Sequence, residues 1–106
     1  MTFPDSITLI GKQAFNGCKN LTSITIPDSV ISIDVYAFRD CSNLTSIIIP
    51  NSANIIYYDT FKNCDHLKTV TIIYLSNEQI NETIKTNYQR MFGNAKIIFT
   101  SERYTK

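Results

Sequence analysis

The apolar residues of this 106-residue chain recur at a spacing of 23. Placing the sequence over itself at that offset aligns the same or a similar residue three times in each of eight columns. A fixed period of this kind is typical of a repeat architecture, in which each unit buries its apolar face against its neighbours. The columns are Pro4, Pro27 and Pro50; Ser6, Ser29 and Ser52; Ile10, Ile33 and Ile56; Phe15, Phe38 and Phe61; Cys18, Cys41 and Cys64; Leu21, Leu44 and Leu67; Ile24, Ile47 and Val70; Ile26, Ile49 and Ile72.

Each unit is predicted to contain one short strand. In LTSITI, LTSIII and LKTVTI, β-branched apolar residues recur at a period of two, which is typical of strands with one buried face. A proline follows the first two segments, where its missing N–H ends the hydrogen-bond ladder. A 23-residue unit is too short for a pair of helices, so the strands are expected to stack in parallel about 4.8 Å apart.

The chain is expected to return from one strand to the next through irregular segments with one tight 3₁₀ turn. The phenylalanine column is expected to form an aromatic stack through the core. In the return segment of the second unit, VISIDVYAFRDC, the residues expected to point inward are Ile33, Ala37, Phe38 and Cys41.

After residue 72 the repeat gives way to a predicted cap. The segment SNEQINETIKTNYQRMFGN predicts a helix over about residues 77–92, with Ser76 or Asn77 as N-cap and Gly93 at its end. KIIF predicts a last strand with Ile97 and Phe99 inward, while Phe92 is expected to continue the phenylalanine column. The apolar stripe of the helix consists of Ile80, Ile84, Tyr88 and Met91.

These elements predict one domain over residues 1–106, an α/β solenoid with a parallel sheet of short strands. About three repeats cover residues 1–72, the cap covers 73–99, and residues 100–106 form a tail. Residues 1–3 align with residues 24–26, so the sequence begins inside a strand and its N-terminal edge has no cap. We expect either a fragment of a longer protein or a homo-oligomer joined edge to edge by a two-fold axis.

The repeat resembles that of the BspA-like leucine-rich repeat family. The shared pattern over residues 1–72 is P-x-S-(V/I)-x-x-I-(G)-x-x-(A)-F-x-x-C-x-x-L-x-x-I-x-I, and its length lies in the range of about 20–29 residues for leucine-rich repeats. The third unit departs from it, with Tyr57 and Thr60 in place of Gly11 and Ala14. The resemblance implies a microbial surface or secreted protein that binds host proteins or cells, with no catalytic residues.

Composition and charge exclude several functional classes. A net charge of +1 and a pI near 7.7 argue against a nucleic-acid partner, which requires a basic stripe. Lysine and arginine are scattered singly, and no apolar run approaches about 18 residues, so neither lipid binding nor membrane insertion is expected. The segment MTFPDSITLIGK lacks the pattern of a signal peptide, so a surface or secreted location is expected from the family resemblance alone.

The cysteines Cys18, Cys41 and Cys64 are the first candidates for chemistry. Their odd number argues against a disulfide scaffold, and their spacing does not suit a zinc site. We expect buried free thiols, with a bridge from Cys41 to either neighbour as the less favoured alternative. The lone His66 has no serine elbow or paired aspartate beside it, and no glycine-rich phosphate loop is present. We therefore expect a protein that is not an enzyme and needs no cofactor or metal.

Three Asn-x-Thr sequons begin at Asn20, Asn43 and Asn81. The first two arise because the repeat itself contains N-L-T, so they are expected to carry no glycan. Asn81, on the predicted helix, is expected to be the most accessible.

The outward face of the predicted sheet is the remaining candidate for function. We expect a protein-binding module, and the alternative is a structural segment that caps or self-associates within a longer repeat protein. A second, aromatic patch is expected on the return side from Tyr36, Tyr57 and Tyr58, since tyrosine suits interfaces. The residues expected on or beside the sheet face are Thr22, Ser23, Thr25, Thr45, Ser46, Ile48, Lys68, Thr69 and Thr71.

Overall fold

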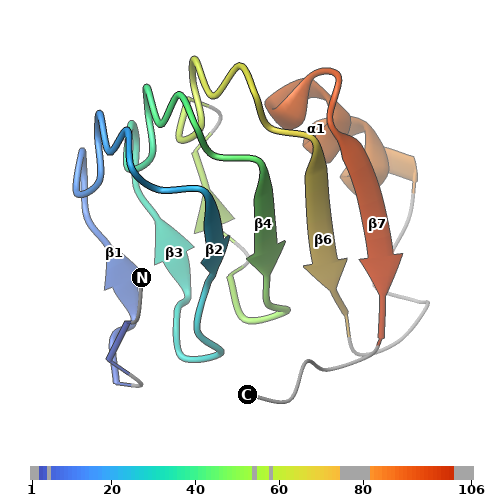
Figure 1. Cartoon of the computed structure of the whole chain (residues 1–106). Coiled ribbons are helices and arrows are strands. Elements are labelled where there is room, and N and C mark those ends of the chain that lie inside the picture. Colours follow the sequence, from blue (N-terminus) through green and yellow to red (C-terminus); the bar gives the residue numbers. More distant parts are fainter. Residues whose placement is uncertain (1–2, 5, 54, 58, 75–81, 102–106) are drawn as a thin grey trace.

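The chain winds into a solenoid whose turns lie side by side (Figure 1). The computed structural model describes residues 3–4, 6–53, 55–57, 59–74 and 82–101. We call each 23-residue turn a coil: coil 1 is residues 4–26, coil 2 is residues 27–49 and coil 3 is residues 50–72.

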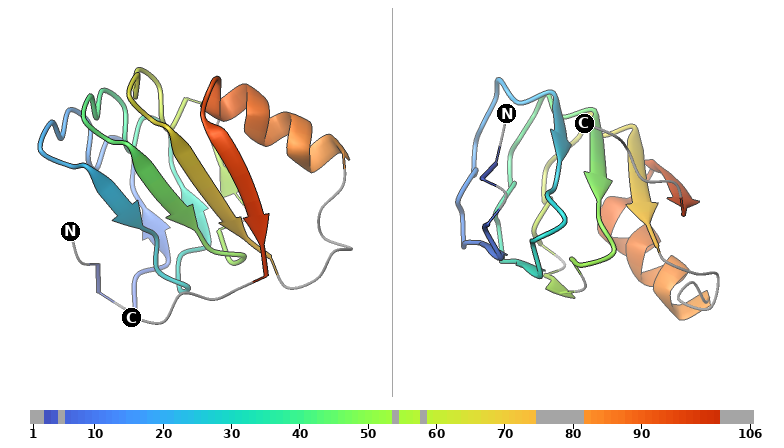
Figure 2. Two further views of the ribbon diagram at one scale, coloured as in Figure 1. Left: turned by 45° about the vertical axis from the view of Figure 1, so that its right-hand side comes forward. Right: turned by 90° about the horizontal axis from the view of Figure 1, so that it is seen from below.

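Two parallel sheets form opposite walls of the described part of the solenoid (Figure 2). The small sheet has the order β1-β3-β5, with β1 at Leu9–Ile10, β3 at Ser32–Ile33 and β5 at Ile55–Ile56. The helix α1 spans Glu82–Phe92 and precedes the last strand. The large sheet has the order β2-β4-β6-β7, with β2 at Ser23–Thr25, β4 at Ser46–Ile49, β6 at Thr69–Ile73 and β7 at Lys96–Thr100. The predicted solenoid of about three turns that ends in a helix and a strand is confirmed.

The strand register reproduces the sequence repeat. Ser46 lies opposite Ser23 and Thr69 lies opposite Ser46, so both pairs are 23 residues apart. The offset becomes 27 between β6 and β7, where Thr69 lies opposite Lys96. The segment that contains α1 therefore accommodates four extra residues without disturbing the alignment of the sheet.

The core lies between the two sheets and consists of the predicted columns. The inward strand residues Ile24, Ile47 and Val70 are at most 3% exposed. In the return segment of coil 2, all four residues expected inward are 0% exposed, which confirms their placement: Ile33, Ala37, Phe38 and Cys41.

The return segments contain more regular structure than expected, because the strands of the small sheet lie within them. Between the sheets the chain makes hydrogen-bonded turns, such as the bond from the Ala37 N–H to the Asp34 carbonyl at 3.2 Å. One turn position in every coil has a left-handed backbone, with φ of 77°, 60° and 64° at Gly17, Asp40 and Asn63. These three residue types are the ones that adopt this conformation most readily.

Backbone hydrogen bonds join neighbouring coils in the turns as well as in the sheets. The Phe15 N–H donates to the Ala37 carbonyl at 2.7 Å, from coil 1 to coil 2. Beside the small sheet the direction reverses, and the Asp34 N–H donates to the Ile10 carbonyl at 2.9 Å. A buried backbone N–H or carbonyl group without a hydrogen-bond partner is energetically costly. The bonds between coils provide such partners in the turns, where the chain is outside the two sheets.

The phenylalanine column forms the predicted aromatic stack. The rings of Phe15 and Phe38 have centroids 5.2 Å apart and planes within 5°, and the Phe38–Phe61 pair is 5.3 Å apart and within 3°. Phe92 of α1 follows at 5.1 Å from Phe61 with its ring tilted by 45°. The stack therefore runs from coil 1 into the C-terminal cap.

The cap closes the far end of the stack, where α1 lies beside β6 and β7 (Figures 1 and 2). Tyr88 and Met91 pack against the core, as do Ile97 and Phe99 of β7. The helix ends as predicted at Gly93, whose φ is 59° and whose N–H donates to the Gln89 carbonyl at 3.0 Å. The predicted start at residue 77, with Ser76, Asn77 and Ile80, lies outside the described residues, and so does the side chain of Ile84.

Replacing Phe38 by alanine is expected to destabilise the whole fold. Phe38 is 0% exposed and stacks on a ring at each side, so truncation leaves a cavity that costs about 3–5 kcal/mol. That loss is large beside the total stability of about 5–15 kcal/mol of a typical domain. Urea denaturation followed by circular dichroism measures it.

The control for this substitution is Leu9→Ala, because Leu9 is 54% exposed on the small sheet. A change of about 0.5 kcal/mol or less is expected for it. Equal losses in the two variants, or a Phe38→Ala protein that melts within a few degrees of the parent, would show that the stack does not carry the fold.

Candidate protein-binding face

The outer face of the large sheet carries side chains in rows that cross the strands. The rows exist because the inward residues alternate with outward ones along each strand, and because the strands stand in register about 4.8 Å apart. The first row is Ser23, Ser46, Thr69 and Lys96, and the second row is Thr25, Ile48, Thr71 and Ile98. We call these two rows the sheet face.

Exposure decreases across the sheet face from β2 toward its centre. Ser23 and Thr25 on β2 are exposed, while Ser46, Ile48 and Thr69 are half-buried. Thr71 is only 6% exposed, because it lies between Ile48 and Ile98 on the neighbouring strands. Thr71 is therefore on the expected face but offers little of its surface to a partner.

Three more of the predicted residues border the sheet face. Thr22 and Lys68 are exposed, and Thr45 is half-buried. The Thr45 hydroxyl donates to the Thr22 carbonyl at 3.0 Å, so it supports the packing of coil 2 on coil 1. Of the three side chains, those of Thr22 and Lys68 are the freer to contact a partner.

The last strand adds two residues that sequence reasoning missed. Lys96 is exposed and Ile98 is 38% exposed, and both belong to the rows of the sheet face. The Lys96 N–H donates to the Lys68 carbonyl at 2.8 Å, so the two lysines start from adjacent strands. The alternation in KIIFT could have predicted them, because inward Ile97 and Phe99 require that Lys96 and Ile98 point outward.

Of the predicted aromatic patch, the structure describes Tyr36 and Tyr57. Tyr36 has the Arg39 guanidinium over its ring at 5.0 Å, a cation–π contact, whereas Tyr57 is 50% exposed beside β5. Among the described residues no ring contact joins Tyr36 to Tyr57, and Tyr58 lies outside them. The other large hydrophobic side chains exposed on or beside the small sheet are aliphatic: Leu9, Ile31 and Ile55, at 54%, 50% and 49%.

The three cysteines are free and serve coil-to-coil packing. The Cys41 thiol donates to the Phe15 carbonyl at 3.3 Å, and the Cys64 thiol donates to the Phe38 carbonyl at 3.0 Å. Burial raises the pKa of both thiols, that of Cys64 to about 12. Because nucleophiles and metal ligands are thiolates, these two groups are unsuited to chemistry at neutral pH.

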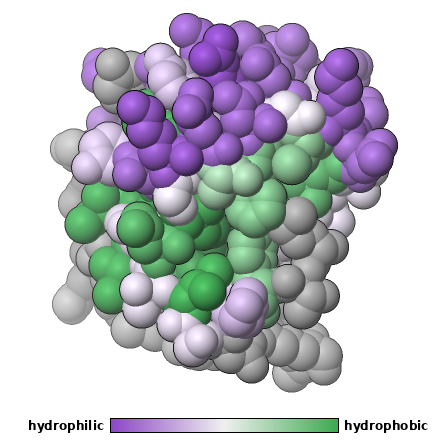
Figure 3. Space-filling model, turned by 90° about the vertical axis from the view of Figure 1, so that its left-hand side faces the viewer, coloured by the Kyte–Doolittle hydropathy of each residue, from purple (hydrophilic) through white to green (hydrophobic). Residues whose placement is uncertain are grey.

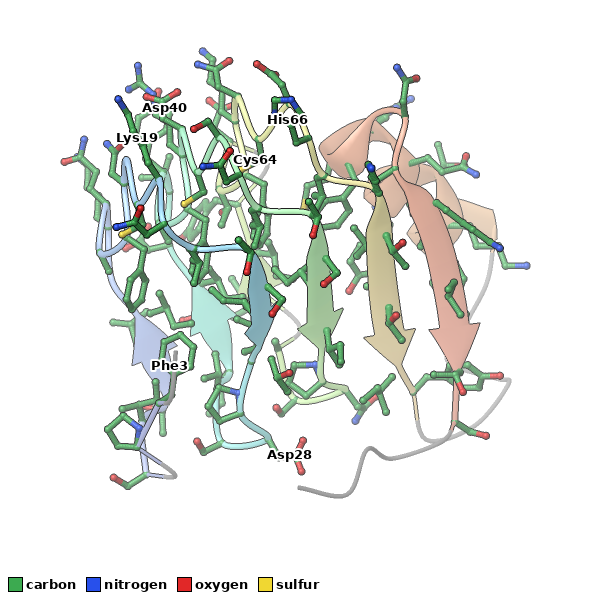
Figure 4. The ribbon with its side chains drawn as sticks, viewed as in Figure 1. Phe3, Lys19, Asp28, Asp40, Cys64 and His66 are labelled. Atoms are coloured by element: carbon green, nitrogen blue, oxygen red, sulfur yellow. The ribbon has the colours of Figure 1, made fainter. Side chains whose placement is uncertain are left out.

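His66 also acts as a packing residue, on the same turn side as Cys64 (Figure 4). Its Nδ1 lies 2.7 Å from the Ser42 carbonyl, and since a carbonyl can only accept, we assign the ring proton to Nδ1. Asn43, one coil earlier, makes the equivalent bond from its amide to the Lys19 carbonyl at 2.7 Å. This bond engages the amide of the Asn43 sequon, and Asn81 lies outside the described residues.

No described group of three His, Cys, Asp or Glu side chains is arranged to hold a metal ion. Within the same residues, no helix is both long and apolar enough to cross a membrane. The arrangement that remains is a surface of hydroxyl, aliphatic and lysine side chains on a rigid parallel sheet.

Comparison with known proteins gives one match. A family model described as BspA type leucine rich repeat region (6 copies) matches residues 1–101. No curated protein and no solved structure matches the chain.

Raising the pH above 9 is expected to destabilise the fold through Cys64. The ordinary thiol pKa is 9.0, while burial raises the folded value to about 12. The unfolded chain therefore loses its proton first, so the contribution is complete below pH 9 and is lost progressively as the pH rises toward about 12.

Urea midpoints measured between about pH 8 and about pH 11 test this effect. The midpoint of the parent should fall with pH more steeply than that of Cys64→Ser, whose hydroxyl keeps a donor for the Phe38 carbonyl but does not ionise in this range. Parallel pH dependences in the two proteins would exclude Cys64 as the cause.

Proposed function

The chain belongs to the BspA-type leucine-rich repeat family, and on that basis we propose that it is a non-enzymatic protein-binding module whose contact surface is the sheet face. Leucine-rich repeats generally mediate protein binding, and the outer surface of a solenoid sheet is where repeat proteins make such contacts. The proposal extends to a microbial surface or secreted protein that contacts host proteins or cells, as the family resemblance suggests.

The observation that carries the proposal is that the two sides of each strand have different roles. The inward residues form the core. Hydrogen bonds between coils engage the thiols of Cys41 and Cys64 and the ring of His66. The exposed residues of the outward rows serve neither purpose, whereas Thr71 is buried between Ile48 and Ile98. They present short hydroxyl side chains that lose little conformational freedom when a partner docks.

The chemistry of the sheet face suits a partner that offers hydrogen-bonding groups around a small apolar contact. Ile48 and Ile98 supply the apolar part, and the serine and threonine hydroxyls can both donate and accept. Lys68 and Lys96 place positive charge at the C-terminal side of the face. Because the sheet has four described strands, a single contact is expected to be small and its affinity weak.

Placing carboxylates at the centre of the sheet face should abolish partner binding. In the variant Ser46→Glu, Ile48→Glu, Thr69→Glu, three charges would be buried without partners in any complex, so capture of the partner should fall at least about tenfold. The measurement is a pull-down on immobilised protein from host-cell extract, with captured proteins quantified by mass spectrometry.

The matched control carries Leu9→Glu, Ser32→Glu and Ile55→Glu on the small sheet, which lies on the opposite wall. A partner captured by the parent and the control, and absent with the first variant, supports the proposal. Equal capture by all three proteins would exclude the sheet face as the contact surface. Circular dichroism must show that both variants keep the fold.

A second candidate function is structural: the module forms the end of a longer array or self-associates through its N-terminal edge. The observation that favours it is the apolar surface at that edge, which lies below the polar turns in Figure 3. Phe3, Ile7, Phe15 and Cys18 pack there and remain partly exposed. Apolar surface at the end of a solenoid needs a cover, which a neighbouring stack or a second copy can supply.

Light scattering at micromolar concentration separates the two forms of this role. Self-association through the N-terminal edge gives twice the chain mass of 12.1 kDa. A mass of 12.1 kDa excludes self-association and leaves the role of an end unit. Substitutions on the sheet face should leave this mass unchanged, so the result does not depend on the first proposal.

A further inference from the structure

We infer that the partner of the sheet face is an acidic protein segment whose carboxylates bind to Lys68 and Lys96. The inference rests on the proposed protein-binding function and specifies the chemistry of the partner. Three features support it. The chain departs from its own repeat at these two positions, the two charges have no described counter-charge, and apolar side chains lie at a fixed distance from them.

The first feature is the departure from the repeat. The position just before the large-sheet strand is Thr22 in coil 1 and Thr45 in coil 2, and it is Lys68 in coil 3. The first row of the sheet face likewise consists of hydroxyl side chains until it ends in Lys96 on β7. Coils 1 and 2 form the same sheet with threonine and serine at these positions. The architecture therefore does not require a lysine at either of them.

The two departures bring like charges together on adjacent strands. The Lys96 N–H donates to the Lys68 carbonyl at 2.8 Å, so the two residues are neighbours across β6 and β7, which lie side by side in Figure 1. Both side chains are exposed. Like charges on neighbouring strands repel each other and lower the stability of the free protein. A local cost without a structural return is typical of a functional site.

The second feature is the lack of a counter-charge among the described residues. Neither Lys68 nor Lys96 forms an ion pair with any of them. A carboxylate of a partner would interact with both ammonium groups at once, because they start from adjacent strands. Since the lysines are exposed, this attraction contributes more to recognition and to the association rate than to affinity. The other members of the sheet face are uncharged: Ser23, Ser46, Thr69, Thr25, Ile48, Thr71 and Ile98.

The third feature is the position of the apolar side chains relative to the lysines. Ile98 follows Lys96 by two residues on β7, and Ile48 lies across Thr71 from it in the same row. Both isoleucines keep part of their side chains exposed. Two residues of extended chain span about 6.6–6.8 Å, and side chains two apart in such a segment point to the same side. An extended segment along β6 and β7 can therefore bring an acidic residue to the lysines and an apolar residue, two positions away, to the isoleucines.

Carboxylates of a protein suit this surface better than the phosphates or sulfates of a polyanion. Nucleic acids and heparin-like glycans require clusters or stripes of basic residues, whereas the rows of the sheet face contain one lysine and a second lysine borders them. Phosphate recognition also favours the two-pronged guanidinium of arginine, and the two rows contain no arginine. The hydroxyl and isoleucine side chains add contacts that a folded or extended protein segment can satisfy.

The test pans a phage-displayed library of random dodecapeptides on the immobilised full chain. Binders are retained when they lose binding to the uncharged variant Ser46→Gln, Ile48→Gln, Thr69→Gln, so that only peptides dependent on the sheet face are analysed and no charge bias is introduced. Most of the retained peptides should carry aspartate or glutamate with a large apolar residue two positions away. Circular dichroism verifies that every variant keeps the fold.

A synthetic copy of the best retained peptide is then titrated against charge variants by calorimetry. In the variant Lys68→Glu, Lys96→Glu, the affinity should fall by about tenfold or more, because two attractions become repulsions. The matched control is Lys19→Glu, Lys62→Glu, which changes the net charge equally at exposed positions in the turns, where Figure 4 labels Lys19. Its affinity should stay within about twofold of the parent. A peptide with lysine in place of its acidic residues should bind the reversed variant better than the parent.

Retained peptides that lack acidic residues, or equal binding by the parent and the reversed variant, overturn the inference and leave the protein-binding proposal standing. If no selected peptide depends on the sheet face, both the proposal and the inference fail. Heparin is titrated in parallel. Tighter binding of heparin than of the peptide, lost in the reversed variant, would make a polyanion the occupant and would also overturn the inference.

Discussion

The stability of this protein depends on contact between residues that are 23 positions apart. A single coil is too small to enclose a core, so each coil buries its apolar side chains against the next one. The phenylalanine stack, the parallel strands and the hydrogen bonds between turns all run in this direction. One register therefore satisfies packing and hydrogen bonding together, and a shift of one residue would disrupt both.

This constraint decides which residues remain for function. Groups that usually suggest chemistry, such as Cys64 and His66, bond to carbonyls of the preceding coil. Thr60 behaves in the same way, with its buried hydroxyl donating to the Asp34 carbonyl at 3.2 Å. The exposed outward residues, such as Ser23 and Thr25, make no such bonds, so their identity can change at little cost to the fold. Binding specificity in this architecture is accordingly a property of the outward rows.

The sequence predicts the inward half of the structure well and the outward half less completely. Each inward column, such as that of Phe15, Phe38 and Phe61, holds three residues spaced by 23. The prediction that a position points inward is therefore supported by three coils. The sequence pattern does not predict the small sheet, because its strands are only two residues long. In addition, outward Leu9 and Ile55 are apolar, so apolar and polar residues do not alternate there. The burial of Thr71 depends on Ile98, which an offset of 27 residues brings beside it. That offset follows from the length of the cap, which no period in the sequence encodes.

The direction of the contacts between coils also determines how the molecule responds to mechanical force. A pull along the stack acts on the contacts between neighbouring coils, because the strands of each coil pair with those of the next. Coils then detach one after another, since each is held by its neighbours and not by the distant ones. Every detached coil releases 23 residues, or about 75–80 Å of extended chain. The solenoid therefore lengthens under force in steps of equal size.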